Sequence, residues 1–310
     1  MPWSPSSGCC GPRMPNDGEP DMSPRVTVIG DALIDELVDE RGTLRFVGGS
    51  ALNVATGLCI LGVPTTLVAM IGDDADGALI RAHVAGYGME FAPTLTPLGT
   101  GVARSERRDG EPHYSFSEPM LHRVLDFDDT QRRAIETADV VAVSGFPLDD
   151  EGQAGLLAEV LEASAGVVAL DPNPRSGMLR DAAAFGRAVE QLGGTVDLLK
   201  LGDDDALLLY GRPVASVIDA LRHRYTHILA TEGSNGASAH LPGRQVSSPA
   251  LASAGGVVDT MGAGDAVFAS VLAEVATAGL EAVEWHATLH RAMGVAAATI
   301  AHPGALLRSP

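Results

Sequence analysis

Lysine is almost absent from this chain of 310 residues. Only Lys200 occurs, and no Gly-Lys-Ser or Gly-Lys-Thr is present, which excludes a Walker-type P-loop. Any phosphate site must therefore use backbone N–H groups, arginine or a metal ion. Basic residues are scarce in general, because 21 Lys and Arg stand against 40 Asp and Glu and give a formal net charge of −19. This acidity disfavours nucleic acid and anionic membrane surfaces as partners.

Cysteine and long apolar runs are also scarce. The three cysteines, Cys9, Cys10 and Cys59, show neither metal-ligand spacing nor a disulfide framework, so a reducing cytoplasm is expected. No run approaches the roughly 18 apolar residues of a membrane span. Residues 1–24 are rich in Pro, Gly, Ser and Asp and lack the apolar core of a signal peptide. They predict a disordered tail before one domain over residues 25–310, with a mis-assigned start, at Met14 or Met22, as the alternative.

Short apolar runs alternate with helical patterns along the rest of the chain. This alternation predicts an α/β fold, a doubly wound and mostly parallel sheet with helices on both faces. Strands are expected at 25–30, 66–72, 139–145, 166–171, 196–201 and 226–231. Helices are expected at 50–61, 76–88, 149–162, 203–210, 213–224, 266–277 and 280–301.

Two polar, turn-rich segments interrupt this rhythm, at about 36–47 and 99–118. We predict that they pair into a small β-sheet that closes over a ligand as a lid and excludes water. Two ordinary surface hairpins are the alternative.

The heptad Asp-Thr-Met-Gly-Ala-Gly-Asp, residues 259–265, directly precedes an expected helix. A glycine-rich turn at a helix start presents free N–H groups and the positive end of the helix dipole, which together bind anions. Asp265 lies in the same turn and can act as a base toward a hydroxyl group. Alternatively, it only complements the dipole. A dinucleotide fingerprint is disfavoured because the sixth position is Val267.

A second glycine motif, Gly-Gly-Ser-Ala-Leu-Asn at 48–53, opens the first expected helix. Gly48 and Gly49 allow a ligand to approach the backbone closely, and Asn53 can both donate and accept hydrogen bonds toward a polyol. The alternative is that Asn53 or Ser50 only caps the helix.

Together these motifs resemble the ribokinase-like (PfkB) family of carbohydrate kinases. The heptad is similar to its C-terminal signature and residues 48–62 to its N-terminal one. Gly-Asp-Asp-x-x-Gly at 72–77 and Thr-Glu-Gly-Ser-Asn-Gly at 231–236 match two further motifs. The similarity runs from about residue 25 to 305. Gly-Asp-Ala-Leu-Ile-Asp at 30–35 and Asp-Pro-Asn-Pro-Arg at 171–175 are closest to fructokinases and 2-keto-3-deoxygluconate kinases.

The resemblance implies a role for each matching residue. Asp265 would be the catalytic base, and Gly262, Ala263 and Gly264 would hold the transferring phosphoryl group. The expected sugar contacts are Asp35, Gly48, Gly49, Asn53, Arg104, Tyr114 and Arg175. The expected ATP contacts are Lys200, Thr231, Gly233, Gly236 and Met293. Asp205 would belong to the Mg²⁺ shell and Asp259 to a monovalent-cation site such as one for K⁺.

Some positions depart from the family pattern. Gly-Asp-Asp-Asp at 202–205 replaces Asn-x-x-Glu, Met261 stands where ribokinases have threonine, and Met293 replaces an asparagine near adenine. Arg175 has a second interpretation as a surface arginine.

The expected activity is ATP-dependent phosphorylation of a sugar, most like that of a fructokinase, with a homodimer through the lid as a possible assembly. A 2-keto-3-deoxygluconate kinase, a ribokinase and a nucleoside kinase are alternatives. A catalytically silent sugar-binding regulator is the alternative from another class.

Overall fold

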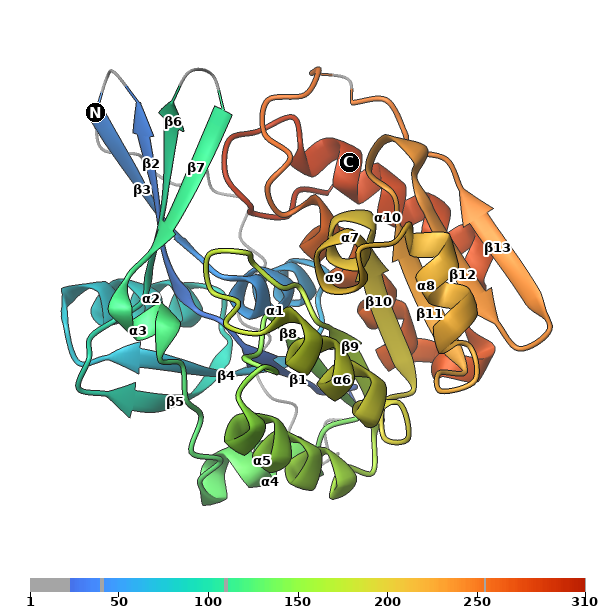
Figure 1. Ribbon diagram of the computed structural model, residues 1–310, viewed down its shortest axis with the longest axis horizontal. Coiled ribbons are helices and arrows are strands. Elements are labelled where there is room, and N and C mark those ends of the chain that lie inside the picture. Colours follow the sequence, from blue (N-terminus) through green and yellow to red (C-terminus); the bar gives the residue numbers. More distant parts are fainter. Residues whose placement is uncertain (1–22, 40–41, 109–110, 254, 310) are drawn as a thin grey trace, which may run out of the picture.

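Figure 1 shows a computed structural model, which describes residues 23–39, 42–108, 111–253 and 255–309. The predicted tail therefore lies outside the described residues, apart from positions 23 and 24. The strands of the larger sheet are β1 (Val26–Gly30), β4 (Thr65–Gly72), β5 (Glu90–Thr96), β8 (Val140–Ser144), β9 (Val167–Asp171), β10 (Leu198–Gly202), β11 (His227–Thr231), β12 (Ala237–Leu241) and β13 (Arg244–Ser248).

The larger sheet has nine strands in the order β13-β12-β11-β10-β9-β8-β1-β4-β5. The strands from β11 to β5 are all parallel, and β12 and β13 add an antiparallel hairpin at one edge. The chain builds outward from β1 in both directions. Ligands bind at such a reversal of strand order, beyond the carboxyl ends of the strands.

Two layers of helices enclose this sheet (Figure 1). One core cluster joins the sheet to α1 (Ser50–Ile60), α2 (Ala75–Gly86), α9 (Ala263–Ala278) and α10 (Trp285–Thr299). A second joins it to α4 (Asp129–Glu136), α5 (Glu151–Glu162), α6 (Ala182–Leu192), α7 (Asp203–Tyr210) and α8 (Val214–Leu221). Strands buried on both faces are apolar throughout, which is why their sequences are continuous apolar runs. The predicted doubly wound α/β fold is confirmed.

A separate four-stranded sheet projects from the larger one at the upper left of Figure 1. It consists of β2 (Leu33–Asp39), β3 (Gly42–Gly48), β6 (Val102–Arg108) and β7 (Glu111–Phe116) in the order β3-β2-β6-β7. The two polar segments do pair into one small sheet, as predicted, and they do so through parallel pairing of β2 with β6.

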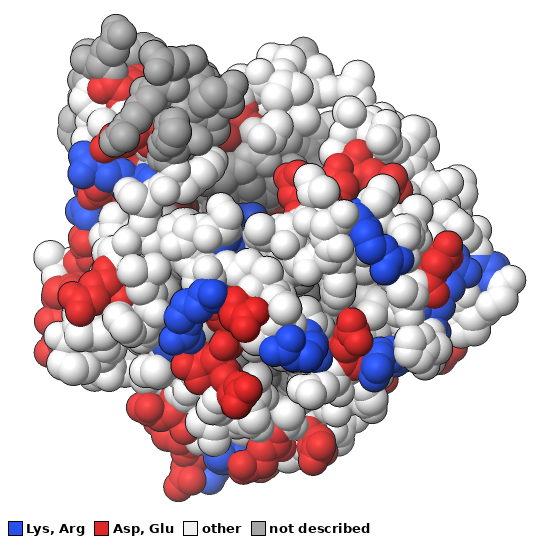
Figure 2. All heavy atoms as spheres, viewed as in Figure 1, with Lys and Arg blue, Asp and Glu red and all other residues white. Residues whose placement is uncertain are grey.

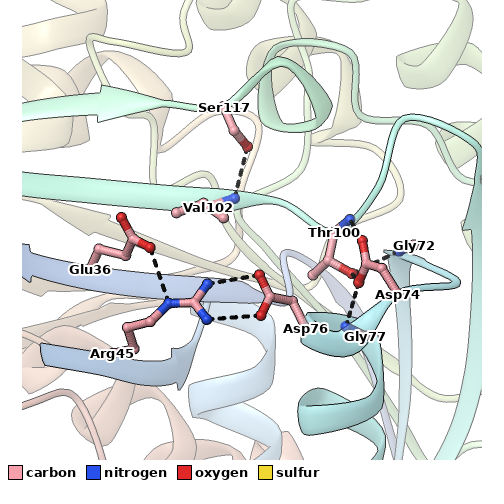
Figure 3. A network of polar contacts seen from close by, with 9 residues as sticks. All are labelled: Glu36, Arg45, Gly72, Asp74, Asp76, Gly77, Thr100, Val102 and Ser117. Carbon is pink, nitrogen blue, oxygen red and sulfur yellow. Dashed lines mark hydrogen bonds and ion pairs between the residues drawn. The ribbon is translucent and has the colours of Figure 1, made fainter. Parts of the chain in front are cut away.

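Side chains from α2 anchor the small sheet (Figure 3). Arg45 on β3 forms two hydrogen bonds with Asp76, at 2.8 and 3.0 Å, and one with Glu36, at 3.0 Å. Asp74 caps α2 by accepting from the Gly77 N–H at 2.8 Å and also binds the N–H and hydroxyl of Thr100, both at 2.7 Å. The Gly-Asp-Asp-x-x-Gly motif therefore joins the start of α2 to the chain that enters β6.

A buried ion pair ties the segment after β7 to the end of β1. Arg123 follows the short helix α3 (Glu118–Leu121), and its Nη1 lies 2.7 Å from Asp31 Oδ2 and 2.7 Å from the Gly145 carbonyl oxygen. Burial raises the pKa of Asp31, and Arg123 opposes this effect. Such a pair fixes the path of the chain between the two sheets.

Within the described ranges, each helix is too short or too polar to cross a lipid bilayer.

Candidate active site

The first turn of α9 is the centre of the candidate site. Gly262 is its N-cap residue and has φ 76°, a left-handed conformation that favours glycine. A Cβ atom there would lie only 2.4 Å from the Ala305 carbonyl oxygen. The first intrahelical hydrogen bond runs from Ala266 N to Gly262 O at 2.8 Å, so the N–H groups of Gly264 and Asp265 precede it. The Ala263 N–H donates to Thr260 O at 3.3 Å. The turn thus presents the N–H groups of Gly264 and Asp265 to an anion, whereas the predicted set was Gly262, Ala263 and Gly264. The Ala263 N–H differs from that prediction because it already has a backbone acceptor.

Asp265 is held by side chains from α1. The Asn53 amide nitrogen donates to Asp265 Oδ2 at 2.9 Å, and the Ser50 hydroxyl donates to Asp265 Oδ1 at 3.1 Å. The carboxylate is only 8% exposed. Donors on both oxygens fix its orientation, which a base toward a bound hydroxyl requires.

Ser50 does not cap α1, so the capping alternative is wrong for this residue. The N-cap of α1 is Gly49, which makes no side-chain capping bond. The Ser50 hydroxyl instead contacts Ser144 at the end of β8 and accepts from the Asn173 amide. Asn173 adopts the left-handed conformation, with φ 41°. Such strain in a non-glycine residue is typical of functional sites.

Lys200 lies behind the anion-binding turn and is 5% exposed. Its Nζ is 3.0 Å from Asp171 Oδ1 and 3.8 Å from Asp205 Oδ2. A Cβ atom on Gly264 would lie 3.3 Å from the same Nζ. Burial disfavours the ammonium, yet the surrounding carboxylates raise the pKa of Lys200 above its usual value. Lys200 is therefore held as a buried cation beside the turn. Figure 2 shows acidic and basic side chains interspersed on one outer face.

Asp35 and Gly48 lie together where β2 pairs with β3. A Cβ atom on Gly48 would lie 2.1 Å from Asp35 Oδ2, so any larger residue would displace this carboxylate. Burial, followed by the nearby charge of Asp265, raises the pKa of Asp35 to about 7. Gly49, with φ 107°, allows the sharp turn from β3 into α1.

This raised pKa gives a prediction about stability. Because the pKa of Asp35 is higher in the folded than in the unfolded chain, its stabilising contribution is lost as pH rises from about 4 to about 7. We expect Asp35→Asn to be about 2–4 kcal/mol more stable than the wild type at pH 8.5, with a smaller difference at pH 5.5. Urea unfolding at both pH values measures this.

The matched control is Asp219→Asn, since that carboxylate is 77% exposed and forms only a surface pair with Arg222. Its stability should follow that of the wild type at both pH values. A constant difference between Asp35→Asn and the wild type across this range would contradict the prediction.

The other expected sugar contacts lie nearer the surface. Arg104 on β6 is 45% exposed in its side chain and pairs with Glu106 at 3.1 Å. Tyr114 on β7 is 57% exposed. Arg175 is exposed and lines a cavity together with Arg123 and Asn173. Its positive charge lowers the pKa of Asp35, but this effect is smaller than the increase that burial causes.

Three of the five expected ATP contacts, Thr231, Gly233 and Gly236, lie at or just after the end of β11. Thr231 ends that strand, and Gly233 begins the 3₁₀ turn η1 (Gly233–Asn235). Gly236 has φ 95°, and a Cβ atom there would lie 2.2 Å from Ser248 O. Met293 on α10 is 5% exposed within the core cluster.

The two expected metal residues are both engaged by the protein itself. Asp205 accepts from the Gly202 N–H at 2.8 Å and pairs with Lys200. Asp259 accepts from the Met261 and Gly304 N–H groups, each at 3.0 Å. The described residues contain no group of three or more His, Cys, Asp and Glu side chains able to hold a metal ion. Among the described residues, a divalent ion would therefore need further oxygen ligands besides these carboxylates, such as phosphates and water.

Four residues of the site were absent from the predicted set: Ser50, Ser144, Asn173 and Asp171. Three of them could have been predicted from their position at the carboxyl ends of parallel strands. Ser144 and Asp171 are the last residues of β8 and β9, and Asn173 lies two residues after Asp171. Ser50 lies inside the second glycine motif.

Comparisons with known proteins show the family of this chain. Residues 24–310 match the family described as pfkB family carbohydrate kinase. A fructokinase of Rhizobium leguminosarum bv. trifolii is 28% identical over 285 residues, which cover 86% of this chain and 78% of that protein. A fructokinase of Klebsiella pneumoniae is 29% identical over 271 residues, covering 84% and 87%.

Solved structures share the fold. A fructokinase from Xylella fastidiosa with bound ATP superposes with a TM-score of 0.77 at 22% identity, covering 91% of this chain and 93% of that one. A fructokinase from Vibrio cholerae O395 with bound fructose, ADP and calcium ion has a TM-score of 0.75 at 21% identity, covering 92% and 96%.

Proposed function

Since this chain belongs to the pfkB family of carbohydrate kinases and is an ATP-dependent sugar kinase, we propose that fructose is the sugar it phosphorylates. The observation that carries the mechanism is the geometry of Asp265, a buried carboxylate oriented by Asn53 and Ser50 beside free helix N–H groups. Relatives named fructokinase support the choice of sugar.

In the proposed reaction, Asp265 accepts the proton of a sugar hydroxyl as its oxygen attacks the γ-phosphorus of ATP. A bond forms between this oxygen and phosphorus, and the bond to the β–γ bridging oxygen breaks to release ADP. The N–H groups of Gly264 and Asp265 would hold the phosphoryl oxygens, with Lys200 adding positive charge behind them. Asp35, Gly48 and Asn53 would bind the sugar, and Arg104, Tyr114 and Arg175 would approach it from the rim.

ATP would lie along Thr231, Gly233 and Gly236, with Met293 beneath the base. Divalent Mg²⁺ would neutralise phosphate charge when bound, with Asp205 as the proposed carboxylate of its shell. Asp259 is the proposed carboxylate for a monovalent cation such as K⁺. The small sheet would act as a lid that excludes water, which otherwise competes as acceptor.

The small sheet is also the proposed surface of a homodimer. Leu44 on β3 is 60% exposed and Tyr114 on β7 is 57% exposed, so each lies open on this sheet. Light scattering after size exclusion measures the assembly, and Leu44→Glu should shift a dimer toward monomer.

ADP release over a panel of sugars tests the function. We expect fructose to give a higher kcat/KM than ribose, 2-keto-3-deoxygluconate, tagatose 6-phosphate and adenosine. Omission of sugar controls for ATP hydrolysis. A preference for another member of the panel would overturn the choice of fructose, and no transfer to any of them would overturn the proposal.

A further inference from the structure

A continuous chain of polar contacts leads from Asp265 into the interior. Ser50 contacts Asp265, Ser144 contacts Ser50, and Ser144 Oγ lies 3.5 Å from Asp171 Oδ2. The other oxygen of Asp171 accepts from Lys200 at 3.0 Å. Ser144 and Asp171 are fully buried, so no solvent competes for these bonds.

Counting protons shows that these contacts cannot all be satisfied at once. The two serine hydroxyls supply two protons for three contacts, namely Ser50 with Asp265, Ser50 with Ser144, and Ser144 with Asp171. While Asp171 is ionised beside the Lys200 ammonium, one contact must lack a proton, and which one it is decides whether Asp265 receives a hydroxyl donor.

The distances favour an orientation toward Asp265. A hydroxyl can donate once and accept twice, and Ser50 uses this capacity fully if it accepts from Asn173 and Ser144 and donates to Asp265. The contact left without a proton is then Ser144 with Asp171, the longest of the three at 3.5 Å. Lys200 compensates the charge of Asp171 there.

We propose that Ser50 and Ser144 form a hydroxyl relay that positions Asp265, and that Lys200 sets its direction by satisfying Asp171. The inference rests on the proposed function in one respect, the role of Asp265 as base. In this arrangement Ser50, Ser144 and Lys200 are positioning residues, because only Asp265 touches the reacting hydroxyl.

The relay affects how easily Asp265 is protonated. A donated hydrogen bond favours the ionised carboxylate, so its loss makes protonation easier and raises the pH below which the base is inactive. The charged groups that face Asp265 are Asp35 on β2, Asp171 on β9 and Lys200 on β10. The contacts of Ser50 are with Asp265, Ser144 and Asn173, whereas Ser144 also contacts Asp171, so of the two changes only Ser144→Ala acts directly on one of these charged groups.

The test compares pH profiles of the intact enzyme. In Ser50→Ala we expect the acid limb of the kcat profile to move up by about one pH unit, and in Ser144→Ala by less, since Ser50 keeps its own proton. KM values for ATP and sugar should change by less than about threefold. The control is Ser270→Ala on α9, whose hydroxyl donates to Ala266 O at 2.7 Å, and its profile should match the wild type.

An NMR titration provides a readout that needs no turnover. In protein with ¹³C-labelled aspartate, the signal of Asp265 is identified by its absence from the spectrum of Asp265→Asn. The midpoint of the pH titration of this signal should also move to higher pH in Ser50→Ala. If the acid limb of the kcat profile and the NMR midpoint of Ser50→Ala both match those of the wild type, the proposed relay is wrong, while the assignment of the protein as a kinase stands. If the wild type phosphorylates no sugar, the proposed function fails and the NMR midpoint alone decides on the relay.

Discussion

Asp265→Asn is expected to lower kcat by about 100- to 10,000-fold, the range that a general base contributes. Asparagine has the same shape but cannot accept the sugar proton. The oxygen of the new carboxamide at position 265 can accept from the Asn53 amide. The NH₂ group of the new carboxamide can donate to the Ser50 hydroxyl once that hydroxyl has rotated. The fold and the affinity for ATP should therefore persist. A coupled assay of ADP release measures kcat, and calorimetry measures ATP binding.

Glu274→Gln is the matched control on the same helix. Glu274 pairs with Arg291 at the surface, far along α9 from its first turn, so its loss should change kcat by less than about twofold. An Asp265→Asn enzyme with near wild-type kcat would show that the base is another group.

Lys200→Met should lower the free energy of unfolding by about 3–5 kcal/mol, because it leaves the buried Asp171 carboxylate without its cation. Asp205 loses the same partner but keeps its hydrogen bond from the Gly202 N–H. Urea unfolding followed by circular dichroism measures the change.

Two variants separate this effect from loss of side-chain packing. The double variant with Asp171→Asn removes both charges of the pair and should recover part of the stability. Glu159→Gln, which removes one charge of an exposed pair with Arg132, should cost at most about 1 kcal/mol. A loss in Lys200→Met no larger than in Glu159→Gln would mean that the buried charges are not coupled as the distances imply.

The parallel core of the fold follows from the sequence because its strands are buried on both faces. All six strands predicted from apolar runs are present, for example Thr226–Thr231 as β11. The missed strands lie at the two edges of the sheet. β12 and β13 form an antiparallel hairpin, and β5 contains Pro93 and alternating polar residues. The edge strands β5 and β13 carry weaker apolar signals, since one side is open to solvent. The inner strand β12 was missed because its short buried sequence contains the polar residues Ser238 and His240.

The candidate site is only partly predictable for a related reason. Asp265 stands out because it shares a turn with three small residues at a helix start. Its partners come from a helix more than 200 positions earlier, and no local pattern specifies that Asn53 and Ser50 face it. Ser144 carries no signal beyond its place at the end of β8, and its role arises only when β8 and β9 lie side by side.

The burial of Lys200 has a practical consequence for chemical probing. Because it is the sole lysine in the chain and only 5% exposed, the folded surface presents no accessible lysine amine to an acylating reagent. Acylation at this position therefore reports transient opening of the central sheet. A ligand that binds over the first turn of α9 should slow this acylation. The rate of acylation of Lys200 would therefore measure what fraction of the protein carries the ligand.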